Sequence, residues 1–304
     1  MSLLVVGSVA YDSIETPSAK RDDVLGGSAT FFSYAASFFT DVRLVAVIGE
    51  DFLEADLDRL RQRRVDLTGL VREPGESFRW GGRYHDNMNE RTTLFTYLNV
   101  FQSFKPVLPP SYRATPLVFL ANIDPALQLD VLDQIESPEL VACDTMNFWI
   151  DGKRDELLEL LARIDVLVVN EEEALDLSGA HYVAGAGRAI QELGPRTVII
   201  KRGEYGAVLF SDQDIFFVHG YPVEDLTDPT GAGDTFAGGF MGYLARTRDF
   251  SARNMRVATV VGSLMASFVV EGFSLEGLYN VDMQKIHERY RDFVAHTQFD
   301  PLKL

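Results

Sequence analysis

A glycine-rich turn that contains a carboxylate is the stretch of this sequence best suited to chemistry. The segment DPTGAGDTFAGGF, residues 228–240, runs directly into a helical pattern. Gly231, Ala232 and Gly233 are small enough for a ligand to approach the backbone, and the amides at a helix N-terminus point at anions such as phosphate. A carboxylate would repel that anion, so we expect Asp234 to take a proton from a hydroxyl group that attacks phosphorus. The alternative is that Asp234 only caps the helix and the glycines only form a tight turn.

Further polar residues follow the apolar runs of the sequence. Ligands bind beyond the carboxyl ends of parallel strands, so these residues are expected to share one sheet edge with the glycine-rich turn. Asn170 and Glu173 are one helical turn apart, and their oxygens suit a hydrated Mg²⁺, although Asn170 taken alone also suits a helix cap. The residues at these strand ends are Asp12, Asn122, Asp124, Asp144, Asn147, Asn170, Glu173 and Lys201.

The elements that would position these residues alternate between short apolar runs and helical patterns. Such an alternation predicts an α/β fold, with a parallel sheet covered on both faces. The strands are expected at 3–7, 42–48, 116–122, 139–144, 165–170 and 197–202. The helices are expected at 28–39 and 52–63, near Pro125, Lys153, Glu171 and Gly185, and through most of the chain from Ala232. We interpret residues 1–304 as one domain.

Two stretches interrupt this alternation, one early in the chain and one from about residue 66 to 104. In the second, Phe78, Trp80, Gly82 and Tyr84 alternate with polar or small residues, which predicts antiparallel strands with one aromatic face. We expect a small protruding β-sheet that acts as a lid, built from segments at roughly 12–26 and 68–104. The alternatives are a hairpin packed on the core and a dimer contact.

The overall composition narrows the range of partners and locations. Lys and Arg number 28 against 45 Asp and Glu, a net charge of −17, so nucleic acid and anionic membranes are poor partners. The single cysteine, Cys143, excludes an internal disulfide and suits a cytoplasmic protein. The five histidines are scattered, which disfavours zinc. A dinucleotide-dependent oxidoreductase is also disfavoured, because no Gly-x-Gly-x-x-Gly follows the LLVVGS run.

Several motifs, taken in order, resemble the PfkB, or ribokinase-like, carbohydrate kinase family. The resemblance covers nearly the whole chain, and the glycine-rich signature at 228–240 is its most specific part. The other motifs are GSVAYDS, GGSATFFSYAA, VIGEDF, NEEE and KRGEYGA. The resemblance implies a ribokinase-like parallel-sheet sandwich with a β-sheet lid. It also implies a kinase that uses ATP and Mg²⁺ to phosphorylate a hydroxymethyl group of a sugar or nucleoside.

The resemblance also implies roles for individual residues. Asp234 would be the base, and the amides of Gly231, Ala232 and Gly233 would form an anion hole. The residues expected to bind substrate are Asp12, Gly26, Gly27, Phe31 and Asn122. The residues expected along the nucleotide are Asn170, Lys201, Gly203 and Gly206. Glu173 and, through water, Asn170 would hold Mg²⁺, and Asp228 matches a position that binds a monovalent cation such as K⁺ in some members.

Two departures from the family pattern bear on the substrate. Phe31 stands where members that bind free sugars often carry asparagine, and DTMNFW, residues 144–149, replaces the more usual Asp-Pro-Asn. The aromatic residues Phe31, Phe32, Phe78, Trp80 and Tyr84 could stack on a nucleobase or simply pack in the core and lid. The substrate can therefore be a sugar or a nucleoside, and the lid can form a homodimer contact. A third alternative is a catalytically silent ligand-binding protein on the same fold, although the intact Asp234 argues against it.

Overall fold

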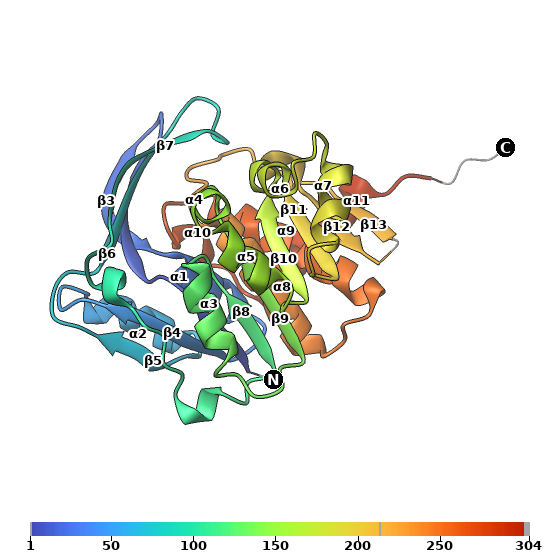
Figure 1. Ribbon diagram of the computed structural model, residues 1–304. Helices are drawn as coiled ribbons and strands as arrows, with labels where there is room; N and C mark the ends of the chain where they lie inside the picture. Colours follow the sequence, from blue (N-terminus) through green and yellow to red (C-terminus); the bar gives the residue numbers. More distant parts are fainter. Residues whose placement is uncertain (1, 213, 301–304) are drawn as a thin grey trace.

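A large, mainly parallel sheet organises the computed structural model, which describes residues 2–212 and 214–300 (Figure 1). Its strand order is β13-β12-β11-β10-β9-β8-β1-β4-β5. Seven of these strands run parallel, while β12 and β13 are added antiparallel at one edge. The strands are β1 (Leu3–Val6), β4 (Val42–Ile48), β5 (Val65–Arg72), β8 (Leu117–Leu120), β9 (Leu140–Asp144), β10 (Val166–Asn170), β11 (Thr197–Lys201), β12 (Ala207–Ser211) and β13 (Asp214–Val218).

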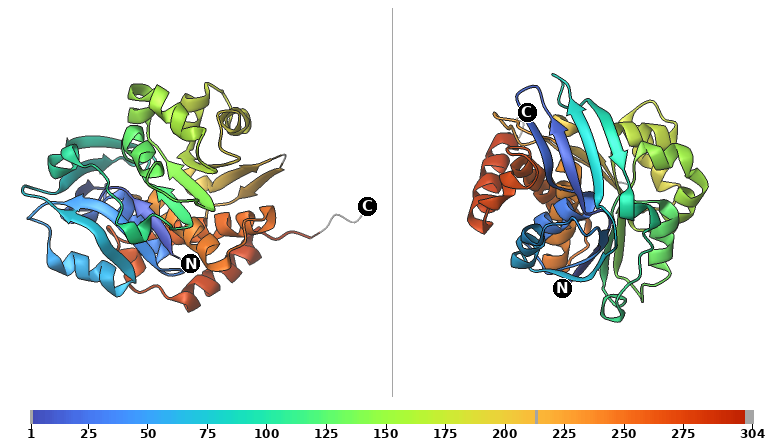
Figure 2. Two further views of the ribbon diagram at one scale, coloured as in Figure 1. Left: turned by 60° about the horizontal axis from the view of Figure 1, so that its bottom comes forward. Right: turned by 90° about the vertical axis from the view of Figure 1, so that its left-hand side faces the viewer.

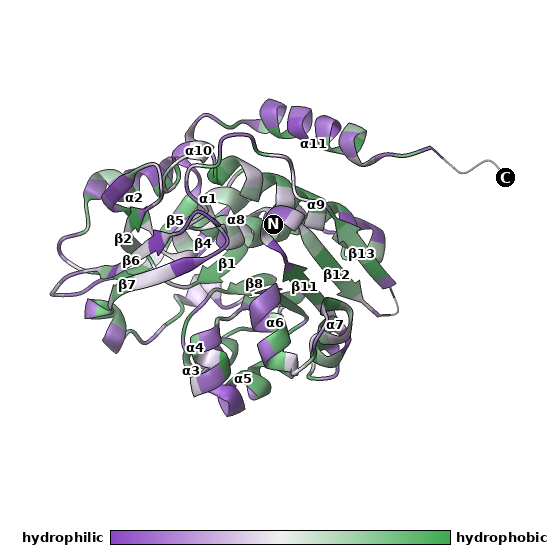
Figure 3. Ribbon diagram, turned by 90° about the horizontal axis from the view of Figure 1, so that it is seen from above, coloured by the Kyte–Doolittle hydropathy of each residue, from purple (hydrophilic) through white to green (hydrophobic). Residues whose placement is uncertain are grey.

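Helices cover both faces of this sheet, as the near-continuous apolar strands predict. One layer contains α1 (Ser28–Ala36), α2 (Glu54–Gln62), α8 (Ala232–Thr247), α9 (Ala252–Val269), α10 (Glu276–Tyr279) and α11 (Met283–Thr297). The other contains α3 (Pro125–Leu132), α4 (Asn147–Gly152), α5 (Arg154–Leu161), α6 (Glu171–Ser178) and α7 (Val183–Gln191). Alternate residues of β1 enter the two cores, with Leu3 and Val5 in one and Leu4 and Val6 in the other. Figure 3 shows the apolar strands inside and a more hydrophilic α11 outside.

A second, smaller sheet of strand order β3-β2-β6-β7 forms the lid. It consists of β2 (Ala10–Glu15), β3 (Lys20–Gly26), β6 (Phe78–Tyr84) and β7 (Arg91–Tyr97). These strands stand together at one side of the molecule and extend beyond the carboxyl ends of the large sheet (Figures 1 and 2). The ribokinase-like architecture with a separate lid is thus confirmed.

The lid differs from the sequence prediction in three respects. Residues 68–72 belong to β5 in the large sheet, so the second lid segment begins later than predicted. The prediction of antiparallel strands holds for β6 and β7 but is wrong for β2 and β6, which pair in parallel. The aromatic face is also divided, because Phe78 stacks on Phe101 while Trp80 folds over Gly82.

The lid touches the main body at several points. The hydroxyl of Thr230, in the glycine-rich turn, donates to the hydroxyl of Tyr84 at 3.0 Å. Phe273 from the main body packs with Ile14 and Tyr84 in a small apolar cluster. The Ser274 hydroxyl donates to the backbone carbonyl of Leu25. These contacts bring β2, β3 and β6 over the residues that precede α8.

None of the helices in the described ranges combines the length and the apolar character that a membrane-crossing segment needs.

Candidate active site

The glycine-rich turn has the geometry that its sequence predicts. Gly231 precedes α8 with a φ of 75°, a left-handed conformation that suits glycine, and α8 begins at Ala232. A side chain at position 231 would also collide with the ring of Phe31, which fills the space beneath the turn. The backbone amides of the first turn of α8 have no partner within the helix. Of these amides, that of Ala232 donates to the Pro229 carbonyl at 3.2 Å. The anion cradle at residues 231–234 stays a prediction.

Lys201, at the end of β11, supplies a positive charge to this cradle. A β-carbon on Gly233 would lie 2.6 Å from the Lys201 ammonium, so the lysine lies directly against the turn. Burial raises the pKa of Asp234, and the charges of Lys201 and Arg91 work in the opposite direction. The carboxylate, the amide cradle and the ammonium group are therefore together at one point, as phosphoryl transfer requires.

Asp12 forms a second acidic position beneath the lid. Only 5% of its surface is exposed, and a β-carbon on Gly26 would lie 2.1 Å from its carboxylate. Burial, followed by the nearby charges of Asp228 and Asp234, raises the pKa of Asp12 to about 8, while the Gly27 amide and Arg91 oppose this shift. Gly26 and Gly27 thus touch the same carboxylate that the sequence analysis assigned to substrate hydroxyls.

Asn170 and Glu173 are held together as a helix cap. The Asn170 side chain accepts a hydrogen bond from the Glu173 amide at 2.8 Å, and Glu173 accepts one from the Asn170 amide at 2.8 Å. This capping box occupies the Asn170 side-chain oxygen and one oxygen of Glu173. Burial raises the pKa of Glu173, and Lys201 is the main opposing charge. The helix-cap interpretation of Asn170 is confirmed, and its predicted contact with Mg²⁺ through water stays a prediction.

Asp144, at the end of β9, is a better-placed partner for Glu173. It is 5% exposed, and its Oδ1 atom has no hydrogen-bond partner among the described residues. Burial and the charges of Asp234 and Glu173 raise its pKa, which Lys201 opposes. No three described His, Cys, Asp or Glu side chains form a ready metal cluster. The free oxygens of Asp144 and Glu173 nevertheless fit a hydrated Mg²⁺, which keeps several waters and needs few protein ligands.

Asp228 ties the glycine-rich turn to the main body. It is fully buried, and its two oxygens accept hydrogen bonds from the Thr230 amide at 2.8 Å and the Ser274 amide at 3.2 Å. Its principal contacts in the structure are therefore with the backbone.

Asn122, just beyond β8, contacts α4. The indole nitrogen of Trp149 donates to its side-chain oxygen at 2.9 Å, and its amide nitrogen faces the sulfur of Met146 at 3.2 Å. Met146 and Trp149 belong to the DTMNFW segment that departs from the family pattern. Asn122 and this segment therefore form one wall at the ends of β8 and β9.

One predicted substrate residue is corrected by its burial. Phe31 is 1% exposed and packs against Gly231, so its ring supports the turn and presents no face on which a base could stack. Phe32 is likewise in the core, stacked on Phe119. Phe31 thus faces the start of α8 and Phe32 faces strand β8, which a residue pattern without the fold could not reveal.

The two glycines predicted along the nucleotide flank a short turn after β11. Gly203 and Gly206 adopt φ values of 56° and 91°. The side-chain oxygen of Asn89, from the loop between β6 and β7, lies so close to Gly203 that a β-carbon there would be 2.2 Å away. The loop between β6 and β7 therefore reaches the turn that follows β11.

Sequence reasoning missed Arg91, the first residue of β7. It pairs across the sheet with Tyr84, and its guanidinium lies 5.6 Å from the centre of the Trp80 ring. Its charge opposes the raised pKa values of Asp12, Glu173 and Asp234. The sequence places Arg91 within the predicted lid, which could have marked it as a candidate site residue. The direction of its side chain, however, depends on the bulge between Gly81 and Gly82.

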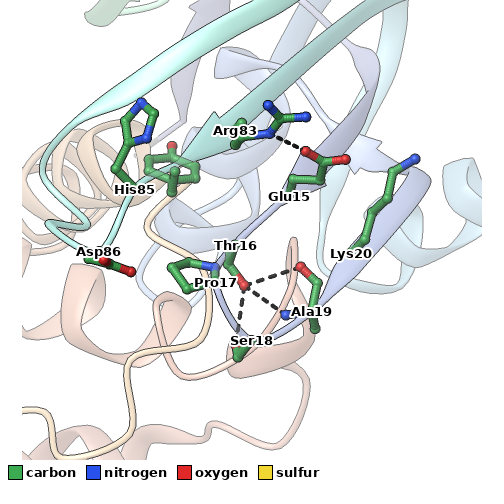
Figure 4. Close-up of a pocket in the computed structure, with 10 residues that line it drawn as sticks. Glu15, Thr16, Pro17, Ser18, Ala19, Lys20, Arg83, His85 and Asp86 are labelled. Carbon is green, nitrogen blue, oxygen red and sulfur yellow. Dashed lines mark hydrogen bonds and ion pairs between the residues drawn. The ribbon is translucent and has the colours of Figure 1, made fainter.

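A groove lies elsewhere on the lid. It encloses about 570 Å³ between the turn that joins β2 to β3 and the end of β6 (Figure 4). Arg83 pairs with Glu15 there, and the Thr16 hydroxyl bonds within its own turn. Of the residues singled out from the sequence, Tyr84 lines this groove, whereas Asp12, Lys201 and Asp234 do not.

Comparison with known proteins agrees with this geometry. The family model for pfkB family carbohydrate kinases matches residues 2–275. A cytidine kinase from Thermococcus kodakarensis is 29% identical over 82% of this chain and 90% of its own length.

Solved structures share the fold. The nucleoside kinase of Methanocaldococcus jannaschii, a member of the ribokinase family, superposes with a TM-score of 0.77 at 21% identity, covering 96% of this chain and 98% of that one. An E. coli protein described as a ribokinase II, in complex with ATP and Mg²⁺, has a TM-score of 0.77 at 19% identity and covers 96% of this chain and 99% of that one.

Proposed function

Since the chain belongs to the pfkB family of carbohydrate kinases, which are phosphotransferases with an alcohol group as acceptor, we propose that it phosphorylates the hydroxymethyl group of a nucleoside with ATP. The observation that carries the proposal is the group formed by Asp234, Lys201 and the first amides of α8. The nucleoside class is supported by the cytidine kinase and nucleoside kinase relatives and by the Asn122, Met146 and Trp149 wall.

In this proposal Asp234 accepts the proton of the attacking hydroxyl. A carboxylate with a raised pKa is a stronger base than an ordinary aspartate. The positive charge of Lys201 opposes this rise in pKa and so favours the ionised form of Asp234. The amides of residues 231–234 and the Lys201 ammonium then face the charge on the transferred phosphoryl group. Asp12, fixed by Gly26 and Gly27, accepts hydrogen bonds from the sugar hydroxyls.

A divalent cation fits beside these residues. Asp144 and Glu173 would hold Mg²⁺ through water, while Asn170 positions Glu173 through the capping box. Bound there, Mg²⁺ would neutralise charge on the nucleotide phosphates. Support comes from the Mg²⁺ and ATP in the E. coli structure. Gly203, which lies against the Asn89 side chain, and Gly206 would lie beside the nucleotide.

Two finer expectations also belong to the proposal. Activation by K⁺ near Asp228 is tested by comparing KCl with NaCl at equal ionic strength. A homodimer through the lid would use the outward-facing Leu94 and Tyr97, which are 44% and 56% exposed. Sedimentation of the wild type and of Tyr97→Glu tests that contact.

The deciding experiment measures phosphoryl transfer by the wild type and by Asp234→Asn. We expect the wild type to phosphorylate nucleosides at least tenfold more efficiently than ribose or fructose. Asp234→Asn should bind ATP normally and lose roughly 10²–10⁴ in kcat, because general-base catalysis contributes about that much. Better turnover of free sugars would refute the nucleoside assignment, and near-normal kcat in a folded Asp234→Asn variant would refute the base.

A further inference from the structure

Arg91 lies on the same face of the lid as Asp12, the residue expected to bind the acceptor. Asp12 pairs with Trp80 across β2 and β6. Tyr84 pairs with Arg91 across β6 and β7, and residues paired in this way share a face of the sheet. The Arg91 guanidinium lies 5.6 Å from the centre of the Trp80 ring on that face. Because the Tyr84 hydroxyl contacts Thr230 at 3.0 Å, Arg91 also lies beside the glycine-rich turn.

Among the described residues, Arg91 has no ion-pair partner, in contrast to the two arginines of β6. Arg79 pairs with Asp51 at 2.8 Å. Arg83 pairs with Glu15 on the opposite face of the lid (Figure 4). Arg91 itself is exposed, and a guanidinium offers five N–H donors and keeps its charge in proteins. Its donors are therefore available to an anion that enters the cleft.

The charge of Arg91 acts on three acids of the site. These are Asp12 in β2, Glu173 in α6 and Asp234 in α8. Burial raises the pKa of each of them, and the positive charge of Arg91 opposes the rise in all three cases. Asp12 is expected on the acceptor side and Glu173 on the nucleotide side, with Asp234 as the base between them. A charge that acts on all three lies near the path that a phosphoryl group would take.

The loop before Arg91 reaches the turn that follows β11. A β-carbon on Gly203 would lie only 2.2 Å from the side-chain oxygen of Asn89, two residues before Arg91. Gly203 follows Lys201, the cation at the end of β11, and both are expected along the nucleotide. Contacts at Thr230 and Gly203 thus fix both sides of the segment that carries Arg91.

Resting on the proposed phosphoryl transfer, we propose that Arg91 is a catalytic residue supplied by the lid, and that its guanidinium binds the phosphoryl group as it passes from ATP to the acceptor. The bond from phosphorus to the ADP oxygen breaks as the bond to the acceptor oxygen forms. The hydroxyl proton goes to Asp234, and Arg91 stays protonated throughout. Lys201 faces the phosphoryl group from the large sheet and Arg91 from the lid, so that two cations offset the charge on its oxygens. Since one cation belongs to the lid, an open lid disfavours transfer to water.

The test compares Arg91→Gln with Arg83→Gln. Both remove one positive charge from the lid, but Arg83 points to the opposite face and pairs with Glu15. We expect Arg91→Gln to lower kcat by about 10²–10³, the usual effect of removing one donor to a developing charge, with little change in the KM of the nucleoside. Arg91→Lys should retain part of the rate because it keeps the charge, and Arg83→Gln should behave like the wild type.

Calorimetry gives a readout that does not depend on turnover. Aluminium fluoride, added to MgADP and a nucleoside, stands in for the phosphoryl group during transfer. Arg91→Gln should bind MgADP as the wild type does, whereas its affinity for the complex with aluminium fluoride should fall by about 10²–10³. A residue that only supports the lid would weaken nucleoside binding equally with and without aluminium fluoride.

The possible outcomes separate this inference from the proposed function. Near-normal kcat in a folded Arg91→Gln variant, or an equal loss in Arg83→Gln, would overturn the inference and leave the nucleoside kinase in place. Equal weakening of binding with and without aluminium fluoride would also overturn it. If Arg91→Gln does not fold, the comparison of Arg91→Lys with Arg83→Lys decides in the same way. Failure of the wild type to phosphorylate any nucleoside would instead reject the proposed function.

Discussion

Asp12 is buried in the folded protein, and two further carboxyl groups, those of Asp228 and Asp234, lie near it. Its pKa is about 8 in the fold, against an ordinary value near 4 in an unfolded chain. The folded state therefore binds a proton more readily than the unfolded state between about pH 4 and pH 8. This contribution to stability is complete at low pH and is lost as the pH rises through about 8.

We therefore predict that Asp12→Asn stabilises the ligand-free protein increasingly as the pH rises. The difference in Tm between the variant and the wild type should be small near pH 5 and largest above pH 8, because asparagine carries no charge to bury. Thermal unfolding across pH 5–9 checks this. Asp130→Asn, at an exposed position in α3, serves as the control. A constant difference in Tm across that range would show that Asp12 does not titrate within it.

At the residue scale, the sequence predicted the positions of site residues best where few residue types could do the chemistry. Lys201 and Asp234 lie at the end of β11 and the start of α8, as expected. Asp12 instead lies within lid strand β2 and not at the end of a strand of the large sheet. Phe31 was assigned wrongly, since an aromatic residue suits a core as well as a ligand and only the packing of α1 against α8 decides between them. Arg91 was missed because the lid's fold determines where it points.

The lid and the glycine-rich turn are joined by the hydrogen bond between Tyr84 and Thr230. We predict that Tyr84→Phe lowers kcat/KM for the acceptor by roughly 2–10-fold, the usual effect of one lost hydrogen bond. ATP hydrolysis without acceptor should rise, because a looser lid admits water. Both rates are measured by ADP release. Tyr97→Phe makes the same change on the outer, exposed side of the lid and should behave like the wild type.

At the scale of elements, six of the seven parallel strands were predictable to within a few residues, whereas most of β5 was assigned to the lid. Each of the six is an uninterrupted apolar run next to an amphipathic pattern. The lid was harder to delimit, because β5 and β6 follow one another in sequence but enter different sheets. Strands β12 and β13 were not predicted. Strand β13 alternates between exposed and buried residues, with Phe217 64% exposed, as is typical of an edge strand, while β12 is a short buried run.

The charge of the whole molecule opposes the approach of a polyphosphate. With a net charge of −17, the protein repels MgATP at long range, although Lys201 and Arg91 attract it at close quarters. The screening length falls from about 30 Å at 0.01 M salt to about 8 Å at 0.15 M. We predict that kcat/KM for ATP rises over this range of NaCl, whereas the value for an uncharged nucleoside stays nearly constant. A fall for ATP would mean that the local cations dominate its encounter with the enzyme.

The hydrogen bond from Ser274 to Leu25 joins residues 249 positions apart, and it lies where the lid meets the main body. A ribosome adds about 5–20 residues per second, so the first lid strands are made roughly 12–50 s before their partner exists. During that interval β2 and β3 can pair with each other and with β6, but they lack their contacts with Phe273 and Ser274. The catalytic cleft is thus among the last parts of the chain to form during synthesis, and a nascent chain stalled before Ser274 should have most of the large sheet but no enzymatic activity.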